Sequence, residues 1–134
     1  MISLTWDSTR LFLHVLAATV WVGGQLVLAA LVPTLRRLGP EVPGAAARAF
    51  NRVAWPAFAV LIATGIWNIV AEHADETGGA YQTTLTVKLV VVAASGLTAW
   101  AHIRSTMPQG RAIFGALTGL TAIGALLLGI LLAG

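Results

Sequence analysis

The stretch "LFLHVLAATVWVGGQLVLAALV", residues 11–32, contains no Asp, Glu, Lys or Arg. An α-helix rises about 1.5 Å per residue, so this stretch is long enough to cross the roughly 30 Å of hydrocarbon in a bilayer. Three further stretches carry at most one such residue each: residues 53–71, 85–103 and 112–133. Transmembrane barrel strands alternate apolar and polar residues, whereas these stretches are apolar throughout, so they predict transmembrane helices.

The composition agrees with a membrane protein. Of 134 residues, 57% are hydrophobic and 10% are charged, whereas soluble domains have about 25% charged residues. We therefore predict an all-α, integral membrane four-helix bundle that forms one domain over residues 1–134. The helices are expected at about residues 10–34, 50–71, 84–104 and 111–133. The prolines and glycines of "VPTLRRLGPEVPGAAARAFNR" (32–52) are expected to end the first helix, and Pro56 to lie in about the first turn of the second.

The distribution of charge predicts the orientation. The loop at residues 72–84 has three acidic residues and no Lys or Arg. The loops after the first and third helices are basic, so the positive-inside rule predicts that they face the cytoplasm. Both termini are then expected on the outer face of the cell's inner membrane. These loops are expected to meet anionic lipid headgroups rather than nucleic acid. The residues expected at the inner interface are Arg36, Arg37, Arg52 and His102.

The first helix carries an ionisable residue inside its apolar stretch. Helical periodicity places His14, Trp21 and Gln25 along one face, with Gly24 beside them. Ionisable groups inside membranes are costly and mark functional sites. A neutral imidazole binds copper, zinc or haem iron, so His14 is the candidate ligand.

Other polar residues are expected near His14. Lys88 lies at a similar distance from the outer end of the third helix, and His73 follows the second helix, so both are predicted to meet His14 in one outward-facing site. His102 lies about 20 Å deeper than His14, too far to share a metal ion. Alternatively, Lys88 snorkels to the headgroups and His73 is a solvated loop residue. Gln25 and Asn68 are expected to line the site, or to satisfy each other or backbone groups.

Aromatic and glycine residues have simpler explanations. Five aromatic residues near the predicted boundaries fit an interfacial belt: Trp6, Trp55, Trp67, Tyr81 and Trp100. Four glycines are expected at helix contacts: Gly24, Gly65, Gly115 and Gly119. The last two form a G-x-x-x-G in the fourth helix, which suits packing within the bundle or contact with a second copy or a larger membrane complex.

Three segments resemble the copper-resistance protein D (CopD) family: "LHVLAATVWVGG" (13–24), "RVAWPAFAVLIATGIWN" (52–68) and "YQTTLTVKLVVVAASGLTAWAHIR" (81–104). The residues that carry the resemblance are His14, Trp21, Gly24, Arg52, Gly65 and Lys88. The HemJ-type protoporphyrinogen oxidases are similar in their His, Trp, Gly and Lys-Leu skeleton. CopD proteins have about twice as many helices, which favours a dimer for this chain.

Three functions follow from these observations. The CopD resemblance implies a protein of copper homeostasis that binds or passes copper near the outer leaflet. The HemJ resemblance implies a redox protein with b-type haem, His14 as axial ligand and Lys88 near a carboxylate, although the second helix lacks the methionine expected there. A ligand-free accessory subunit is the third possibility.

The chain has no cysteine, and Met1 and Met107 lie outside the spans, so a methionine ladder for Cu(I) is absent. Whether the protein is an enzyme is left open.

Overall fold

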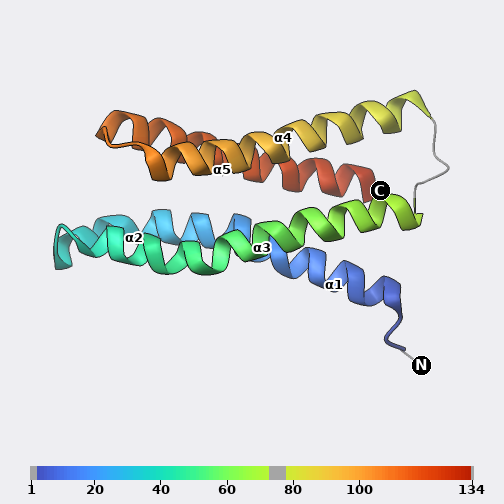
Figure 1. Cartoon of the computed structure of the whole chain (residues 1–134), viewed down its shortest axis with the longest axis horizontal. Helices are drawn as coiled ribbons and strands as arrows, with labels where there is room; N and C mark the ends of the chain where they lie inside the picture. Colours follow the sequence, from blue (N-terminus) through green and yellow to red (C-terminus); the bar gives the residue numbers. More distant parts are fainter. Residues whose placement is uncertain (1–2, 73–77, 134) are drawn as a thin grey trace. The chain divides into compact units, whose positions relative to one another are not determined.

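The computed structural model describes residues 3–72 and 78–133. Its elements are helices α1 (Trp6–Ala18), a π-helical turn η1 (Thr19–Gly23), α2 (Gly24–Leu38), α3 (Val42–Glu72), α4 (Gly79–Arg104) and α5 (Pro108–Ala133) (Figure 1). No strand occurs in these two ranges, so the predicted all-α class is confirmed.

Four helices are long and apolar enough to cross a membrane. They are Trp6–Leu38, which combines α1, η1 and α2, and then Val42–Ala71, Gly79–Arg104 and Pro108–Leu132. Each corresponds to one of the four apolar stretches of the sequence, so the prediction of four membrane-spanning helices is confirmed. The protein is a multi-pass membrane protein in contact with a lipid bilayer.

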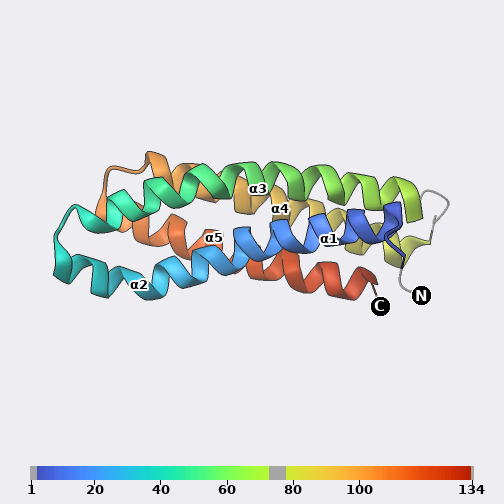
Figure 2. The same cartoon turned by 90° about the horizontal axis from the view of Figure 1, so that it is seen from below.

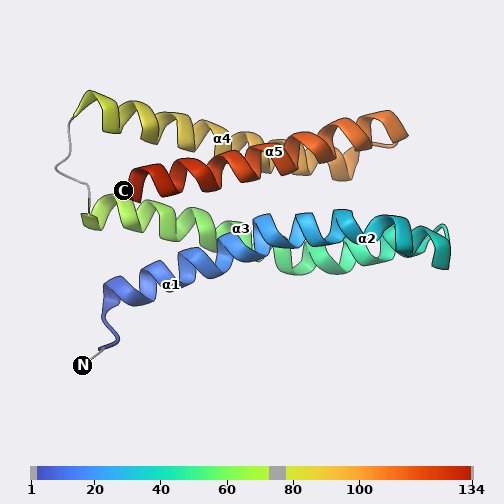
Figure 3. The ribbon, with the colours of Figure 1, turned by 180° about the vertical axis from the view of Figure 1, so that it is seen from behind.

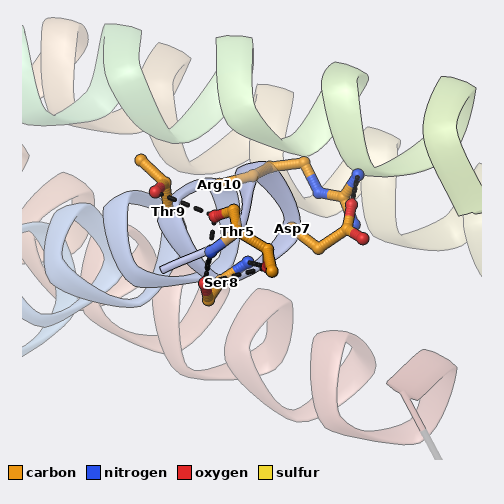
Figure 4. Close-up of polar contacts among 5 residues, drawn as sticks. All are labelled: Thr5, Asp7, Ser8, Thr9 and Arg10. Carbon is orange, nitrogen blue, oxygen red and sulfur yellow. Dashed lines mark hydrogen bonds and ion pairs between the residues drawn. The ribbon is translucent and has the colours of Figure 1, made fainter. Parts of the chain in front are cut away.

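Local sequence explains where the helices start and stop. A capping box begins α1: the Ser8 amide donates to Thr5 Oγ1 over 3.1 Å, and the Thr5 amide donates to Ser8 Oγ over 2.8 Å (Figure 4). Gly39, in extended conformation, follows the last residue of α2, and Pro40 comes next. Pro108 is the first residue of α5, a position that needs no amide donor.

Two prolines lie inside helices. Pro33 is within α2, and the first span ends instead at Gly39 and Pro40 of the same predicted breaker segment. Pro56 is well inside α3, so the prediction that it lies near the start of the second helix is wrong. The alanine-rich segment 45–49 favours helix and extends α3 back to Val42. Each proline removes one backbone hydrogen bond, which transmembrane helices tolerate better than soluble ones.

The chain forms two compact units, Met1–Ala74 and Asp75–Gly134. In the first unit, α3 runs antiparallel to the first span and packs against α1, η1 and α2 (Figures 1 and 2). In the second unit, α4 and α5 pair along their lengths as an antiparallel hairpin (Figure 3). The candidate site residues are therefore divided between two helical assemblies.

Most large apolar side chains face outward. The buried apolar residues are few and mainly small: Ala17, Trp21, Val22, Ala54 and Ala122. Residues such as Leu97 and Leu120 are each 68% exposed. An aqueous surface does not tolerate so much continuous apolar area, whereas acyl chains solvate it. Contacts between the helices therefore depend on small residues and on a few polar groups.

Candidate functional site

His14 faces α3 within the first unit. Its Nδ1 lies 2.9 Å from the Oγ1 atom of Thr64, a residue that is only 4% exposed. Thr64 Oγ1 also lies 2.7 Å from the carbonyl oxygen of Val60, one turn earlier in α3. A Cβ atom added at the adjacent Gly65 would lie 3.5 Å from His14 Cε1, an ordinary van der Waals distance. The imidazole thus rests on the α3 surface formed by Thr64 and Gly65, and it is partly buried there.

Arg10 lies one turn before His14 and was missed as a site residue. No role was predicted for it from the sequence, yet the residue is only 1% exposed. Its Nη1 lies 3.3 Å from Oδ1 of the exposed Asp7 (Figure 4). The spacing of Arg10, His14, Ala17 and Trp21, at intervals of four, three and four, places them on one helical face. That spacing is the sequence signal that could have identified Arg10.

Trp21 lies at the centre of an aromatic cluster. It is 3% exposed, and its ring centroid lies 4.3 Å from that of Phe58 and 5.5 Å from that of Trp55. Trp55 therefore packs against Trp21 and Phe58 within the first unit, and its place in an interfacial belt stays a prediction. Trp6 and Trp67 form a separate pair with centroids 6.5 Å apart, where α1 begins and α3 approaches its end.

The buried residues Trp21 and Val22 both lie in a π-helical turn of the first span. Residues Thr19–Gly23 form this wide turn, and the Thr19 hydroxyl donates to the carbonyl oxygen of Val15 over 2.8 Å. Hydroxyl bonds of this kind compete with the helical ladder, and π-bulges occur frequently at functional sites. The turn separates the half of the span that carries His14 from the half that carries Gln25.

Gln25 and Asn68 are not neighbours. Gly24 lies against the ring of Phe50, because a Cβ atom there would come 2.8 Å from Phe50 Cζ. Asn68 is 18 residues beyond Phe50 in α3, about 27 Å along the helix axis. The antiparallel register therefore excludes a Gln25–Asn68 pair. Gln25 Nε2 is buried and has no hydrogen-bond partner among residues 3–72 and 78–133.

Lys88 lies in the second unit, and its side chain contacts α5 at Gly129. A Cβ atom at Gly129 would lie 3.4 Å from Lys88 Nζ, so the lysine side chain passes over this glycine. His14 and Lys88 belong to different units, and their shared pocket stays a prediction. Counted from the helix starts at Trp6 and Gly79, they lie eight and nine residues in.

His102 joins α4 to the start of α5. Its Nδ1 lies 2.7 Å from the carbonyl oxygen of Arg111, and its ring packs on Gly115, where a Cβ atom would come within 3.2 Å. Among the described atoms, nothing lies within 4 Å of a Cβ atom at Gly119. The two glycines of the G-x-x-x-G thus differ. Gly115 packs against the imidazole of His102, whereas no described atom occupies the space beside Gly119.

The remaining predicted residues are three arginines and His73. Arg36 and Arg37 occupy the last turn of α2, and Arg52 is exposed on α3. His73 is outside the described residues. Across the part of the chain that the structure describes, no three His, Cys, Asp or Glu residues are placed to hold a metal ion.

Comparison with known proteins identifies the family. The family model described as copper resistance protein D matches residues 44–133, which is most of the chain. The match begins after the first helix and includes the fourth helix, which lies beyond the three resembling segments that end at residue 104. No curated protein and no solved structure matches the chain. The chain therefore belongs to the copper resistance protein D family of copper-resistance-related membrane proteins.

Proposed function

We propose that this protein binds copper transiently at His14 and passes it on near the outer face of the cell's inner membrane. The observation that carries the proposal is the position of His14, an imidazole inside a membrane-spanning helix that is held by Thr64 across 2.9 Å. Copper is the metal in this proposal because the chain belongs to the copper resistance protein D family. The matched residues, 44–133, include Thr64 on α3.

The donor chemistry favours transfer over storage. Imidazole nitrogen binds copper, whereas the soft thiolate that retains Cu(I) tightly is unavailable because the chain has no cysteine. A single histidine supplies one bond. His73, which follows α3 in the sequence, is the second donor in this proposal, and Lys88 is the third residue of the site. An ion held by so few donors is released readily to the next carrier.

The orientation and assembly belong to the same proposal. Both termini lie outside, because the basic residues gather at the α2–α3 and α4–α5 connections, which also places Arg36, Arg37 and Arg52 among inner headgroups. A second copy packs against α5. The open position at Gly119 and the exposed Leu120 beside it support that contact.

Cu(I) binding to the purified protein tests the function. Competition with a chromophoric Cu(I) chelator in detergent should give an affinity that falls at least about tenfold in His14→Ala. The matched control is His102→Ala, because His102 also uses Nδ1 for a hydrogen bond but lies at the opposite end of a span. Equal affinity in the native protein and His14→Ala would overturn the proposal.

The same sample separates the alternatives. A Soret band that disappears in His14→Ala would identify a haem protein in place of a copper carrier. A colourless protein that binds no copper would leave the accessory role as the better interpretation. Copper binding without a Soret band, lost in His14→Ala and retained in His102→Ala, is the expected outcome.

A further inference from the structure

We infer that Thr64 is a positioning residue that fixes the proton of His14 on Nδ1 and so presents the Nε2 lone pair as the metal-binding atom. The copper consequence rests on the proposed function, whereas the position of the proton does not. Thr64 itself makes no bond to the metal in this inference; it acts through the imidazole.

The Thr64 hydroxyl carries a single proton, which it can donate to only one acceptor fully. Thr64 Oγ1 lies 2.7 Å from the carbonyl oxygen of Val60 and 3.2 Å from that of Leu61. Carbonyl oxygens only accept hydrogen bonds, so the 2.7 Å contact is attractive only when the hydroxyl proton points along it. The proton of Thr64 is therefore committed to its own helix.

That commitment determines the role of the imidazole. Thr64 Oγ1 has only lone pairs left to offer, and His14 Nδ1 lies 2.9 Å away. An attractive contact then requires His14 to donate from Nδ1. In a neutral imidazole one ring nitrogen carries the proton and the other carries the lone pair, so the lone pair is on Nε2.

The surroundings reinforce this arrangement. Thr64 is 4% exposed, so water has little access to replace its hydroxyl. Gly65 supports the ring beside it, with 3.5 Å between His14 Cε1 and a Cβ atom at position 65. Metal-binding histidines commonly donate their other ring N–H to an oxygen acceptor, which fixes the tautomer and orients the ring. Thr64 supplies such an acceptor from the neighbouring helix.

Nitrogen NMR of the imidazoles tests the inference without copper. Long-range ¹H–¹⁵N spectra of ¹⁵N-histidine-labelled protein in detergent, at a pH where the rings are neutral, distinguish protonated from unprotonated ring nitrogens. The spectrum of His14→Ala identifies the His14 signals by their absence. We expect a protonated Nδ1 and an unprotonated Nε2 for His14. A proton on Nε2 in the native protein would overturn the inference.

Two substitutions of Thr64 complete the test. Thr64→Val keeps the shape and removes the acceptor, so the His14 proton should move toward Nε2, the position that neutral imidazole prefers in water. Thr64→Ser restores the acceptor and should restore the native spectrum. An unchanged His14 tautomer in Thr64→Val would also overturn the inference. Circular dichroism checks that both variants keep their helices.

Copper affinity then distinguishes the two hypotheses. Thr64→Val should weaken Cu(I) binding by about tenfold, and Thr64→Ser should stay close to native. If His14→Ala loses copper while Thr64→Val keeps both native tautomer and affinity, the positioning role fails and the function stands. If the tautomer responds to Thr64→Val and His14→Ala still binds copper fully, the copper function fails and the role of Thr64 in setting the proton stands.

Discussion

His102 and Gly115 form an interlocking contact between α4 and α5. The imidazole lies so close to Gly115 that a Cβ atom there would come 3.2 Å from both Cε1 and Nδ1 of the ring. Because Nδ1 is also engaged with the Arg111 carbonyl oxygen at 2.7 Å, the ring has little freedom to move aside.

A methyl group at position 115 should therefore destabilise the second unit. We expect Gly115→Ala to lower the free energy of unfolding by about 1–3 kcal/mol, because an overpacked contact must shift. Gly119→Ala is the matched control, since the site one turn later is open within the described residues. Unfolding with SDS in mixed micelles, followed by circular dichroism, measures both. Equal stability of the two variants would contradict this packing.

A pair of threonine hydroxyls should contribute measurably to the same hairpin. Thr118 Oγ1 lies 3.0 Å from Thr98 Oγ1, and Thr118 is 5% exposed. Thr118→Val should cost about 0.6 kcal/mol, the average for polar contacts between membrane helices. Thr121→Val serves as the control. Both hydroxyls lie 2.7 Å from a carbonyl oxygen one turn earlier, that of Phe114 for Thr118 and that of Leu117 for Thr121, and Thr118 differs in that its hydroxyl also reaches Thr98 of α4. A larger loss for Thr121→Val than for Thr118→Val in the same unfolding assay would contradict the assignment.

The aromatic cluster should dominate the stability of the first unit. Trp21→Ala removes a side chain that packs on both Phe58 and Trp55, and the cavity should cost about 3 kcal/mol or more. Trp67→Ala is the comparison, because Trp67 is 39% exposed and should cost much less. Tryptophan fluorescence and helicity during SDS titration report the two unfolding midpoints. Similar midpoints would argue against a central role for Trp21.

The orientation can be tested with single cysteines, because the native chain has none. A membrane-impermeant maleimide added to intact cells should label Ser3→Cys and Gly78→Cys and spare Leu38→Cys and Thr106→Cys. These positions are exposed beyond the ends of the spans or at their last residues. Permeabilised cells provide the control for reactivity. The reverse labelling pattern would show that both termini lie inside.

The sequence predicts the four spans well, because an almost uncharged apolar run of about 20 residues is typical of a transmembrane helix. The helix ends were harder to predict, because segments such as residues 45–52 are alanine-rich but not continuously apolar, and α3 extends through them to Val42. Arg36 and Arg37 likewise lie within α2 and not after it. Helix propensity, not hydrophobicity, determines these extensions.

The candidate site was predictable only in part. The periodicity of the first span identified the face shared by His14 and Trp21, because one helix determines it. The partner of His14 was not predictable, because the contact with Thr64 depends on the antiparallel register between two helices. A threonine inside an apolar helix gives no signal of its own, since its hydroxyl usually bonds to a carbonyl one turn earlier. Arg10 is the first residue of the helix predicted at about residues 10–34, and its burial was not predicted.

The π-helical turn at Thr19–Gly23 has a mechanical consequence for the first span. Such a turn accommodates one residue more than an α-helical turn, and each residue of an α-helix corresponds to a rotation of about 100°. If this segment tightened to α-helical geometry while the α2–Phe50 contact held, the α1 part of the span would rotate by about that angle. His14 would then leave Thr64 and face acyl chains, so the wide turn acts as a spacer that keeps the imidazole aimed at its neighbour.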